Sequence, residues 1–314
     1  ADTYCDAAKE KICKFCHRDD LQVHFLVGGT QTNTTVIAAL LRPWQGVVSA
    51  VSGHINCHET GAIESTGHKV IALPTPDGKL TAKQVKDYVE WQKNDESEEH
   101  IVQPGMVYIS HPTETGMLYS KAELTEIFNT CREYGLPLYI DGARLGYGLT
   151  ADGNDLTLPE IARLCDVFYI GGTKVGALFG EAVVIMNEKY KKDFRFMIKQ
   201  RGGMLAKGRL LGIQFDTLFT DDLYTKIARN ANDMAYQIRD IFVSNGYPLL
   251  FDSPTNQQYP IISDEELAIL GKDFGYEYWE RVDETHSGVR FCGSWATTQE
   301  QVDALREAVN ALKK

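Results

Sequence analysis

The chain has 314 residues, of which 43% are hydrophobic and 24% are charged, and its formal net charge is -11. This acidic balance argues against a nucleic-acid partner, because such proteins concentrate lysine and arginine on one face. The apolar runs, such as residues 36–41, are far shorter than the ~20 residues of a membrane-spanning helix. We therefore expect a soluble protein without a membrane partner, and two unequal domains, since a chain of this length exceeds what one core usually serves.

The cysteines and the start of the chain bear on its compartment. Seven cysteines are scattered between Cys5 and Cys292, and an odd number without regular spacing favours reduced thiols in a cytoplasmic protein. Residues 13–17, Cys-Lys-Phe-Cys-His, match a haem-attachment pattern, but they lie on an expected helix, so we interpret both cysteines as packing residues. The first residue is Ala1 and residues 1–18 already predict a helix; we expect that a preceding segment was removed, disordered or never included.

Residues 21–185 alternate short β-rich runs with helical patterns, which is typical of βαβ units and a mainly parallel sheet. The predicted strands are residues 23–27, 47–51, 69–73, 106–110, 138–140, 167–170 and 182–186. Helical spacing falls at residues 34–41, 81–91 and 121–134. Because ligands of such sheets bind at the carboxyl ends of the strands, the polar groups that follow these strands are the candidates for a site.

The second half of the chain changes character. Helical patterns cover residues 189–199, 205–219 and 223–244, and a small αβ module follows. In that module we predict strands at residues 259–262, 275–282 and 288–292 and an amphipathic helix at residues 299–312. The sequence therefore predicts an α/β protein with a large domain of residues 1–220 and a small C-terminal domain of residues 221–314.

A lysine and an aspartate stand out at two strand ends. Lys174 lies among small residues in the segment 171–176, Gly-Gly-Thr-Lys-Val-Gly, where glycine leaves no packed core around an amine. Asp141 ends an earlier strand and opens the segment Asp-Gly-Ala-Arg at residues 141–144. Pyridoxal phosphate chemistry requires a carboxylate that keeps the pyridine nitrogen protonated and an amine that binds the cofactor covalently. The order and spacing of these two motifs predict pyridoxal 5'-phosphate as the cofactor.

A glycine-rich turn at residues 28–30 follows the first strand and opens a helix. Unpaired N–H groups and the helix dipole form an anion site at such a place. Alone, the turn is also explained as a tight bend with Thr30 as helix cap. On the same rim as Lys174 and Asp141, it predicts phosphate binding by Gly29 and Thr30.

His54 also follows a strand. Its ring could stack on a flat cofactor and move a proton near neutral pH, or it could be a half-buried histidine with satisfied hydrogen bonds. His54 and His58 could also form half of a metal site, but no further ligand spacing supports one, so we predict no metal.

Two arginines have two interpretations each. Arg290 lies in a predicted strand of the small domain, where a guanidinium is costly unless a carboxylate meets it. That carboxylate could belong to a salt bridge between elements or to a substrate. Arg144, three residues after Asp141, has the same two interpretations. Two arginines that clamp one carboxylate would fit an amino-acid substrate.

In these residues the chain resembles the threonine aldolase and β-eliminating lyase group of fold type I pyridoxal phosphate enzymes, over nearly its whole length. The segment 141–144 is the most specific match, and Lys174 follows in the family's order. The resemblance implies an aspartate aminotransferase-like large domain with a seven-stranded, mainly parallel sheet. It assigns the cofactor contacts to the following residues: Gly29, Thr30, His54, Asp141 and Lys174.

The resemblance also implies the substrate contacts, with three departures from the family pattern. Arg144 and Arg290 match the arginines that bind the substrate carboxylate, and Glu59 matches as well. Glu114 stands where many members have a second active-site histidine, and Lys207 lies near the position of a phosphate-binding arginine from the neighbouring subunit. Family members begin with a segment that carries a substrate-binding serine, and we expect this chain to begin after it.

The implied activity is that of an aldolase that cleaves L-threonine or L-allo-threonine to glycine and acetaldehyde, with His54 or Glu114 near the proton that moves. A β-eliminating lyase or racemase on the same scaffold, or a cofactor-free relative that only binds amino acids, are the alternatives. The glycine spacing of residues 171–176 disfavours a dinucleotide enzyme. The implied partners are a small amino-acid substrate and further copies of the chain, in a homodimer or homotetramer with sites at the subunit interface.

Overall fold

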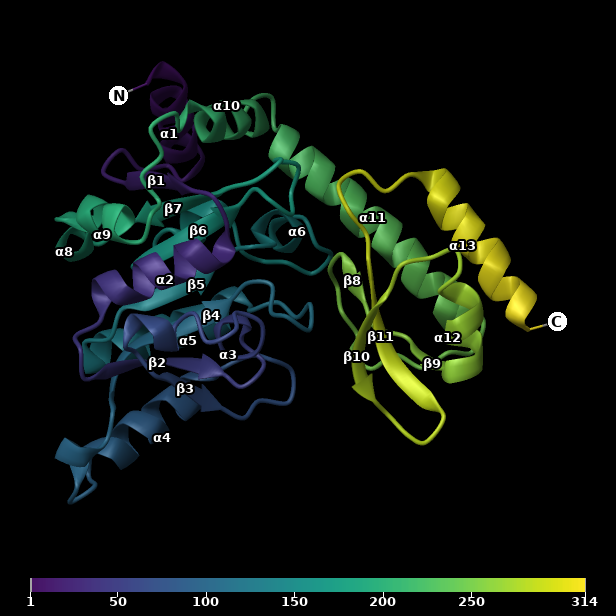
Figure 1. Cartoon of the computed structure of the whole chain (residues 1–314), viewed down its shortest axis with the longest axis horizontal. Coiled ribbons are helices and arrows are strands. Elements are labelled where there is room, and N and C mark those ends of the chain that lie inside the picture. Colours follow the sequence, from purple (N-terminus) through teal and green to yellow (C-terminus); the bar gives the residue numbers. More distant parts are fainter. Residues whose placement is uncertain (1, 314) are drawn as a thin grey trace.

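The computed structural model describes residues 2–313, so the predicted helical start at Ala1 lies outside the described residues. A seven-stranded sheet and a four-stranded sheet organise the chain (Figure 1). The strand order of the large sheet is β1-β7-β6-β5-β4-β2-β3. Only β7 runs antiparallel to its neighbours β1 and β6, while the remaining pairs of these strands are parallel. The predicted α/β class with a mainly parallel seven-stranded sheet is confirmed.

The strands of the large sheet have apolar side chains on both faces, because helices cover both. Their bounds are β1 Gln22–Leu26, β2 Gln45–Ala50, β3 Val70–Leu73, β4 Gln103–Ser110, β5 Leu138–Asp141, β6 Val167–Gly171 and β7 Glu181–Ile185. All residues of β5, β6 and β7 are buried. Helices α2 (Gly29–Leu40) and α9 (Phe194–Gln200) pack on one face. The other face carries α1 (Thr3–Phe15), α4 (Ala82–Lys93), α5 (Lys121–Tyr134) and α10 (Arg209–Leu218).

Several helices begin and end where their sequence signals lie. Helix α5 has a capping box of Ser120 and Glu123, and its C-terminal cap is Gly135, which is left-handed with φ 67°.

The predicted helix at residues 189–199 is instead two short helices, α8 (Glu188–Lys191) and α9, because Asp193 adopts φ 65° between them. The predicted helix at residues 205–219 begins only at Arg209, after the cap residue Gly208. Short helices α3 (His54–Cys57), α6 (Leu145–Leu149) and α7 (Leu158–Ile161) lie in the loops that follow strands.

The C-terminal part forms a separate hydrophobic cluster around the smaller sheet. This sheet contains β8 (Gln257–Gln258), β9 (Ile261–Ser263), β10 (Glu277–Arg281) and β11 (His286–Cys292). Of the predicted strand at residues 259–262, only residues 261 and 262 lie in a strand, β9. Tyr259 and Pro260, which lacks a backbone N–H, separate β9 from β8. Helices α12 (Asp264–Leu270) and α13 (Gln299–Leu312) complete this part.

The long helix α11 (Leu223–Ser244) connects the two sheets, since it contacts α6 beside the large sheet and α13 beside the small one (Figure 1). The boundary predicted at residue 220 falls between α10 and α11 and stays a prediction. Within residues 2–313, no helix is both long enough and apolar enough to cross a membrane.

Candidate active site

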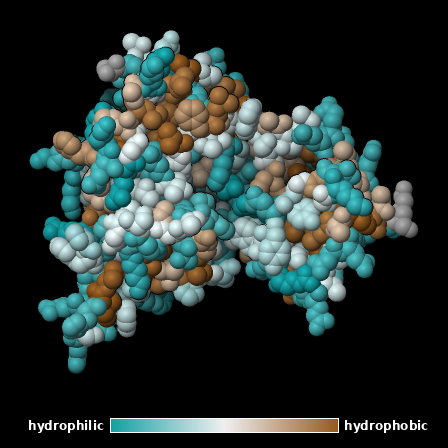
Figure 2. Space-filling view, in the orientation of Figure 1, coloured by the Kyte–Doolittle hydropathy of each residue, from teal (hydrophilic) through white to brown (hydrophobic). Residues whose placement is uncertain are grey.

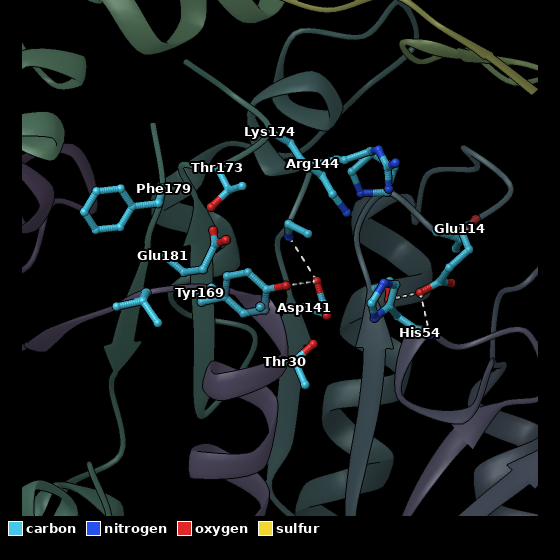
Figure 3. Close-up of a pocket in the computed structure, with 17 residues that line it drawn as sticks. Thr30, His54, Glu114, Asp141, Arg144, Tyr169, Thr173, Lys174, Phe179 and Glu181 are labelled. Atoms are coloured by element: carbon cyan, nitrogen blue, oxygen red, sulfur yellow. Dashed lines mark hydrogen bonds between the residues drawn. The ribbon is translucent and has the colours of Figure 1, made fainter. Parts of the chain in front are cut away.

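A pocket of about 270 Å³ opens where the strands β1, β4, β5 and β6 end (Figure 3). Loops that follow parallel strands gather at one edge of the sheet, so residues far apart in sequence meet there. Predicted site residues that line this pocket are Gly29, Thr30, His54, Glu114, Asp141, Arg144 and Lys174. Three further predicted residues, Glu59, Lys207 and Arg290, do not belong to its lining.

Asp141, the last residue of β5, is buried and held by four hydrogen-bond donors. Its Oδ1 accepts from the hydroxyl of Tyr169 at 2.5 Å and from the backbone N–H of Ala143 at 3.0 Å. Its Oδ2 accepts from the hydroxyl of Tyr108 at 2.6 Å and from Nδ2 of Asn33 at 3.2 Å. These donors fix the orientation of the carboxylate at the floor of the pocket (Figure 3).

Lys174 lies in the loop between β6 and β7. Burial lowers the pKa of its amine to about 8, with the nearby charge of Arg144 acting in the same direction and Asp141 opposing it. Glycine is required around it, because a Cβ at Gly172 would lie 2.6 Å from the carbonyl oxygen of Gly180. An amine with a pKa near 8 is neutral in a substantial fraction of molecules near neutral pH, so it can act as a nucleophile.

His54 begins helix α3 and lies against a carboxylate that is itself buried. Its Nδ1 is 2.8 Å from Oε1 of Glu59, whose side chain has no exposed area. The same Oε1 accepts from Nδ2 of Asn33 at 2.7 Å. Burial lowers the pKa of His54, but the hydrogen bond to Glu59 and the charge of Asp141 outweigh it and raise the pKa above its ordinary value. The structure thus places Glu59 behind His54 and Asn33 rather than in the pocket.

Glu114 lies in the loop after β4, on the same side of the pocket as His54 (Figure 3). Its Oε1 accepts from the hydroxyl of Ser110 at 2.6 Å and from the backbone N–H of His54 at 2.9 Å. The hydroxyl of Tyr259, from the C-terminal part, donates to the backbone carbonyl of Glu114. Burial raises the pKa of the Glu114 carboxyl, against the hydrogen bond from Ser110.

The two arginines occupy different positions. Arg144 lines the pocket, whereas Arg290 lies on β11, where it pairs with Glu277 and donates from Nη1 to Oε1 of Gln257 at 2.9 Å. The salt bridge that was one interpretation of Arg290 is therefore present. Its charge still acts on the pocket. The pKa of Lys174 is lowered first by burial, and the charges of Arg144 and Arg290 lower it as well. Lys207 is exposed in the segment before α10, so its predicted role in a neighbouring subunit stays a prediction.

Sequence reasoning missed several residues of this site: Asn33, Tyr108, Tyr169 and Glu181. Tyr108 and Tyr169 read as ordinary apolar strand residues, although their hydroxyls need partners when buried. Asn33 is fully buried in a helix, and a buried amide signals a polar network. Glu181 is a charged residue at the start of an otherwise apolar strand, and this position is the sequence signal that could have identified it as a site residue.

The sheet topology, the aspartate that ends β5 and the lysine after β6 define a fold type I pyridoxal phosphate enzyme architecture. A protein-family model described as β-eliminating lyase matches residues 2–297. The chain belongs to this family.

Individual proteins give the same relationship. The chain is 30% identical over 289 residues to a low specificity L-threonine aldolase of Pseudomonas aeruginosa, covering 91% of this chain and 82% of that protein. A Leishmania major threonine aldolase structure has a TM-score of 0.96 and 43% identity, covering 100% of this chain and 90% of that one. The histidinol-phosphate aminotransferase of Clostridium acetobutylicum has a TM-score of 0.75 at 13% identity over 99% of this chain and 90% of that one, which shows the fold alone.

Proposed function

We propose that the chain is a pyridoxal phosphate-dependent carbon–carbon lyase of the threonine aldolase type. It cleaves L-threonine or L-allo-threonine to glycine and acetaldehyde. The observation that carries this function is that Lys174, Asp141 and the start of α2 line the same pocket. Relatives named threonine aldolase, which align with most of this chain, support the same activity.

The residues present fit pyridoxal phosphate. Lys174 offers an amine of lowered pKa for the covalent link, and Asp141 offers a fixed carboxylate for the ring nitrogen. Backbone N–H groups of Gly29 and Thr30 at the start of α2 suit the phosphate, and His54 supplies a flat ring for stacking. When bound, the cofactor supplies a ring that accepts the electrons left on the substrate's α-carbon as the bond to the β-carbon breaks.

The chain's own residues bind the substrate and move its proton. Arg144 and Arg290 hold the substrate carboxylate, one from the pocket wall and one from the C-terminal part. The β-hydroxyl proton needs an acceptor as the carbon–carbon bond breaks. Nδ1 of His54 is engaged with Glu59, so Nε2 is the ring nitrogen available to the hydroxyl. The Glu114 carboxyl accepts a hydrogen bond from the backbone N–H of His54, and it lies beside this histidine, where it relays the proton.

Product analysis tests this function. The purified protein with its cofactor is incubated separately with L-threonine, L-allo-threonine and L-serine, and acetaldehyde, glycine, pyruvate and ammonia are measured. Aldehyde with glycine in equal amounts supports the aldolase, and the Lys174→Ala variant is the matched control. A keto acid with ammonia would instead identify the β-eliminating alternative, and no turnover in protein that holds the cofactor would favour a binding protein.

We also propose a homodimer or homotetramer in which Lys207 of one copy acts in the site of another. Figure 2 shows hydrophobic side chains gathered over α10, where Leu210 and Ile213 are 55% and 37% exposed. Leu178, four residues after Lys174, is 88% exposed, so apolar surface reaches the pocket region. Such patches favour association.

Mixing two inactive variants tests the shared site. A hybrid of Lys174→Ala and Lys207→Ala copies regains one intact site, so activity should return on mixing after dissociation and reassembly. Light scattering of the wild-type protein gives the number of copies. A monomer, or a mixture that stays inactive although it reassembles, contradicts the shared site.

A cytoplasmic location is proposed as well. All seven cysteines among the described residues are free, which suits a reducing compartment. Fractionation of cells that express the protein checks it, and recovery in a secreted fraction with disulfides formed would exclude it.

A further inference from the structure

Glu181 is a buried carboxyl in the candidate pocket for which the proposed reaction has no use. It is 4% exposed and begins β7. Its Oε2 accepts from the backbone N–H of Gly172 at 2.9 Å, and the carboxyl points toward the hydroxyl of Thr173 (Figure 3). Both neighbours are neutral donors. Burial favours the protonated form of this carboxyl, whereas the hydrogen bonds that it accepts from these donors favour the ionised form.

The strand register places Glu181 beside the anion-binding start of α2. Glu181 pairs with Gly171 on one side and with Leu26 on the other. Leu26 ends β1, and Gly28, the N-cap of α2, follows two residues later. Glu181 and Gly28 both line the pocket. A carboxylate here would repel any anion at the helix start, whereas a protonated carboxyl could donate a hydrogen bond to it.

We propose that Glu181, in its protonated form, binds the phosphate group that occupies the start of α2, and that its ionisation weakens the binding of phosphate esters. The identity of the phosphate compound as pyridoxal phosphate rests on the proposed function. No covalent bond changes in this step: the carboxyl keeps its proton and shares it with a phosphate oxygen.

The surroundings of Glu181 set the pH range of this effect. Burial raises the pKa of Glu181 to about 7, against the hydrogen bonds from Thr173 and Gly172, which lower it. The charge of Asp141 raises this pKa further, and the charge of Lys174 lowers it. Titratable tyrosines also face it from β5, β6 and α11, and burial raises the pKa of each: Tyr139, Tyr169 and Tyr224. They are therefore neutral near pH 7. Asp141 and Lys174 are the charged groups that act on Glu181.

The test compares two ligands that differ only in the phosphate. Equilibrium dialysis measures the affinity of cofactor-free protein for pyridoxal phosphate and for pyridoxal, and their ratio removes effects on the covalent link to Lys174. Between about pH 6.5 and about pH 8.5 a carboxyl with pKa about 7 loses most of its proton, so the wild-type ratio should fall about 20-fold relative to Glu181→Gln. Glutamine keeps a neutral donor at every pH. The second ionisation of the phosphate, near pH 6, affects both proteins alike.

Equal pH dependence in the wild type and Glu181→Gln overturns the role of Glu181. Loss of the preference for phosphate at every pH in the variant overturns it too, because glutamine retains the hydrogen bond. Binding of neither compound by the wild type would reject the cofactor itself, which is a separate failure. If Glu181→Gln does not fold, calorimetry of the wild type in buffers of different ionisation enthalpy decides. Near pH 8, pyridoxal phosphate must take up more protons than pyridoxal, and equal uptake refutes the proposal.

Discussion

The substitution Glu59→Gln tests the effect of the Glu59 charge on His54 separately from the hydrogen bonds that the Glu59 side chain accepts. The glutamine oxygen can still accept from Asn33 and from the ring N–H of a neutral His54, so mainly the negative charge is removed. His54 is 31% exposed and the Glu59 side chain is 0% exposed, which places this ion pair largely out of solvent. A hydrogen bond between charged groups of this kind contributes about 1.5–3 kcal/mol. The protonated form of His54 should lose stabilisation of that size.

The expected effect depends on pH with a definite sign. Burial lowers the pKa of His54, but the hydrogen bond to Glu59 and the charges of Asp141 and Glu59 together raise it by more, so the pKa in the folded protein lies above the ordinary value. A raised pKa contributes stability that is fully present below the unfolded value and is lost as pH rises through the folded value. The free energy of unfolding of Glu59→Gln should therefore fall furthest below the wild type at acidic pH, and the difference should shrink toward alkaline pH.

Urea unfolding of cofactor-free protein at a series of pH values measures this difference. Glu64→Gln, an exposed carboxylate of the same loop, is the matched control and should follow the wild type within about 0.5 kcal/mol. Kinetics give a second measurement: the acidic limb of the activity profile should move to lower pH in Glu59→Gln, since His54 must be neutral to accept a proton. A stability difference that stays constant with pH, together with an unmoved acidic limb, would refute the coupling of Glu59 to His54.

Three further substitutions test the other parts of the site. Lys174→Ala should abolish the covalent link to the cofactor and leave the melting temperature of cofactor-free protein unchanged. In the wild type, mass spectrometry after borohydride reduction should find the cofactor adduct on Lys174, and an adduct on another lysine excludes the assignment. Asp141→Asn should retain cofactor but lose most activity, because an amide cannot hold the pyridinium proton, and near-normal turnover would contradict this role. Arg290→Lys should raise KM by about 10- to 100-fold, equivalent to ~1.5–3 kcal/mol, with a smaller fall in kcat. An unchanged KM with a lowered melting temperature would mean that Arg290 serves only its salt bridge to Glu277.

The sequence by itself determined the parts of the protein that depend on local chemistry. Lys174 and Asp141 could be found because each follows an apolar run, and parallel strands bring their carboxyl ends together. The start of α2 could be found because glycine and threonine after a strand mark a helix start with free N–H groups. Long helices such as α11 could be predicted from their apolar period, whereas helix ends such as Asp193 depend on a backbone angle that the sequence pattern does not specify.

Only the tertiary structure decided how the polar side chains pair. Asn33 lies 108 positions from Asp141 and 26 from Glu59, and no local pattern in the sequence indicates that it bridges them. Glu59 matched a substrate contact by position, but its carboxylate is hydrogen-bonded to Asn33 and His54 and does not line the pocket. Glu181 enters the site only because β7 is inserted between β1 and β6. Hydrogen-bond partners depend on strand order, register and side-chain direction, and these are properties of the folded chain rather than of neighbouring residues.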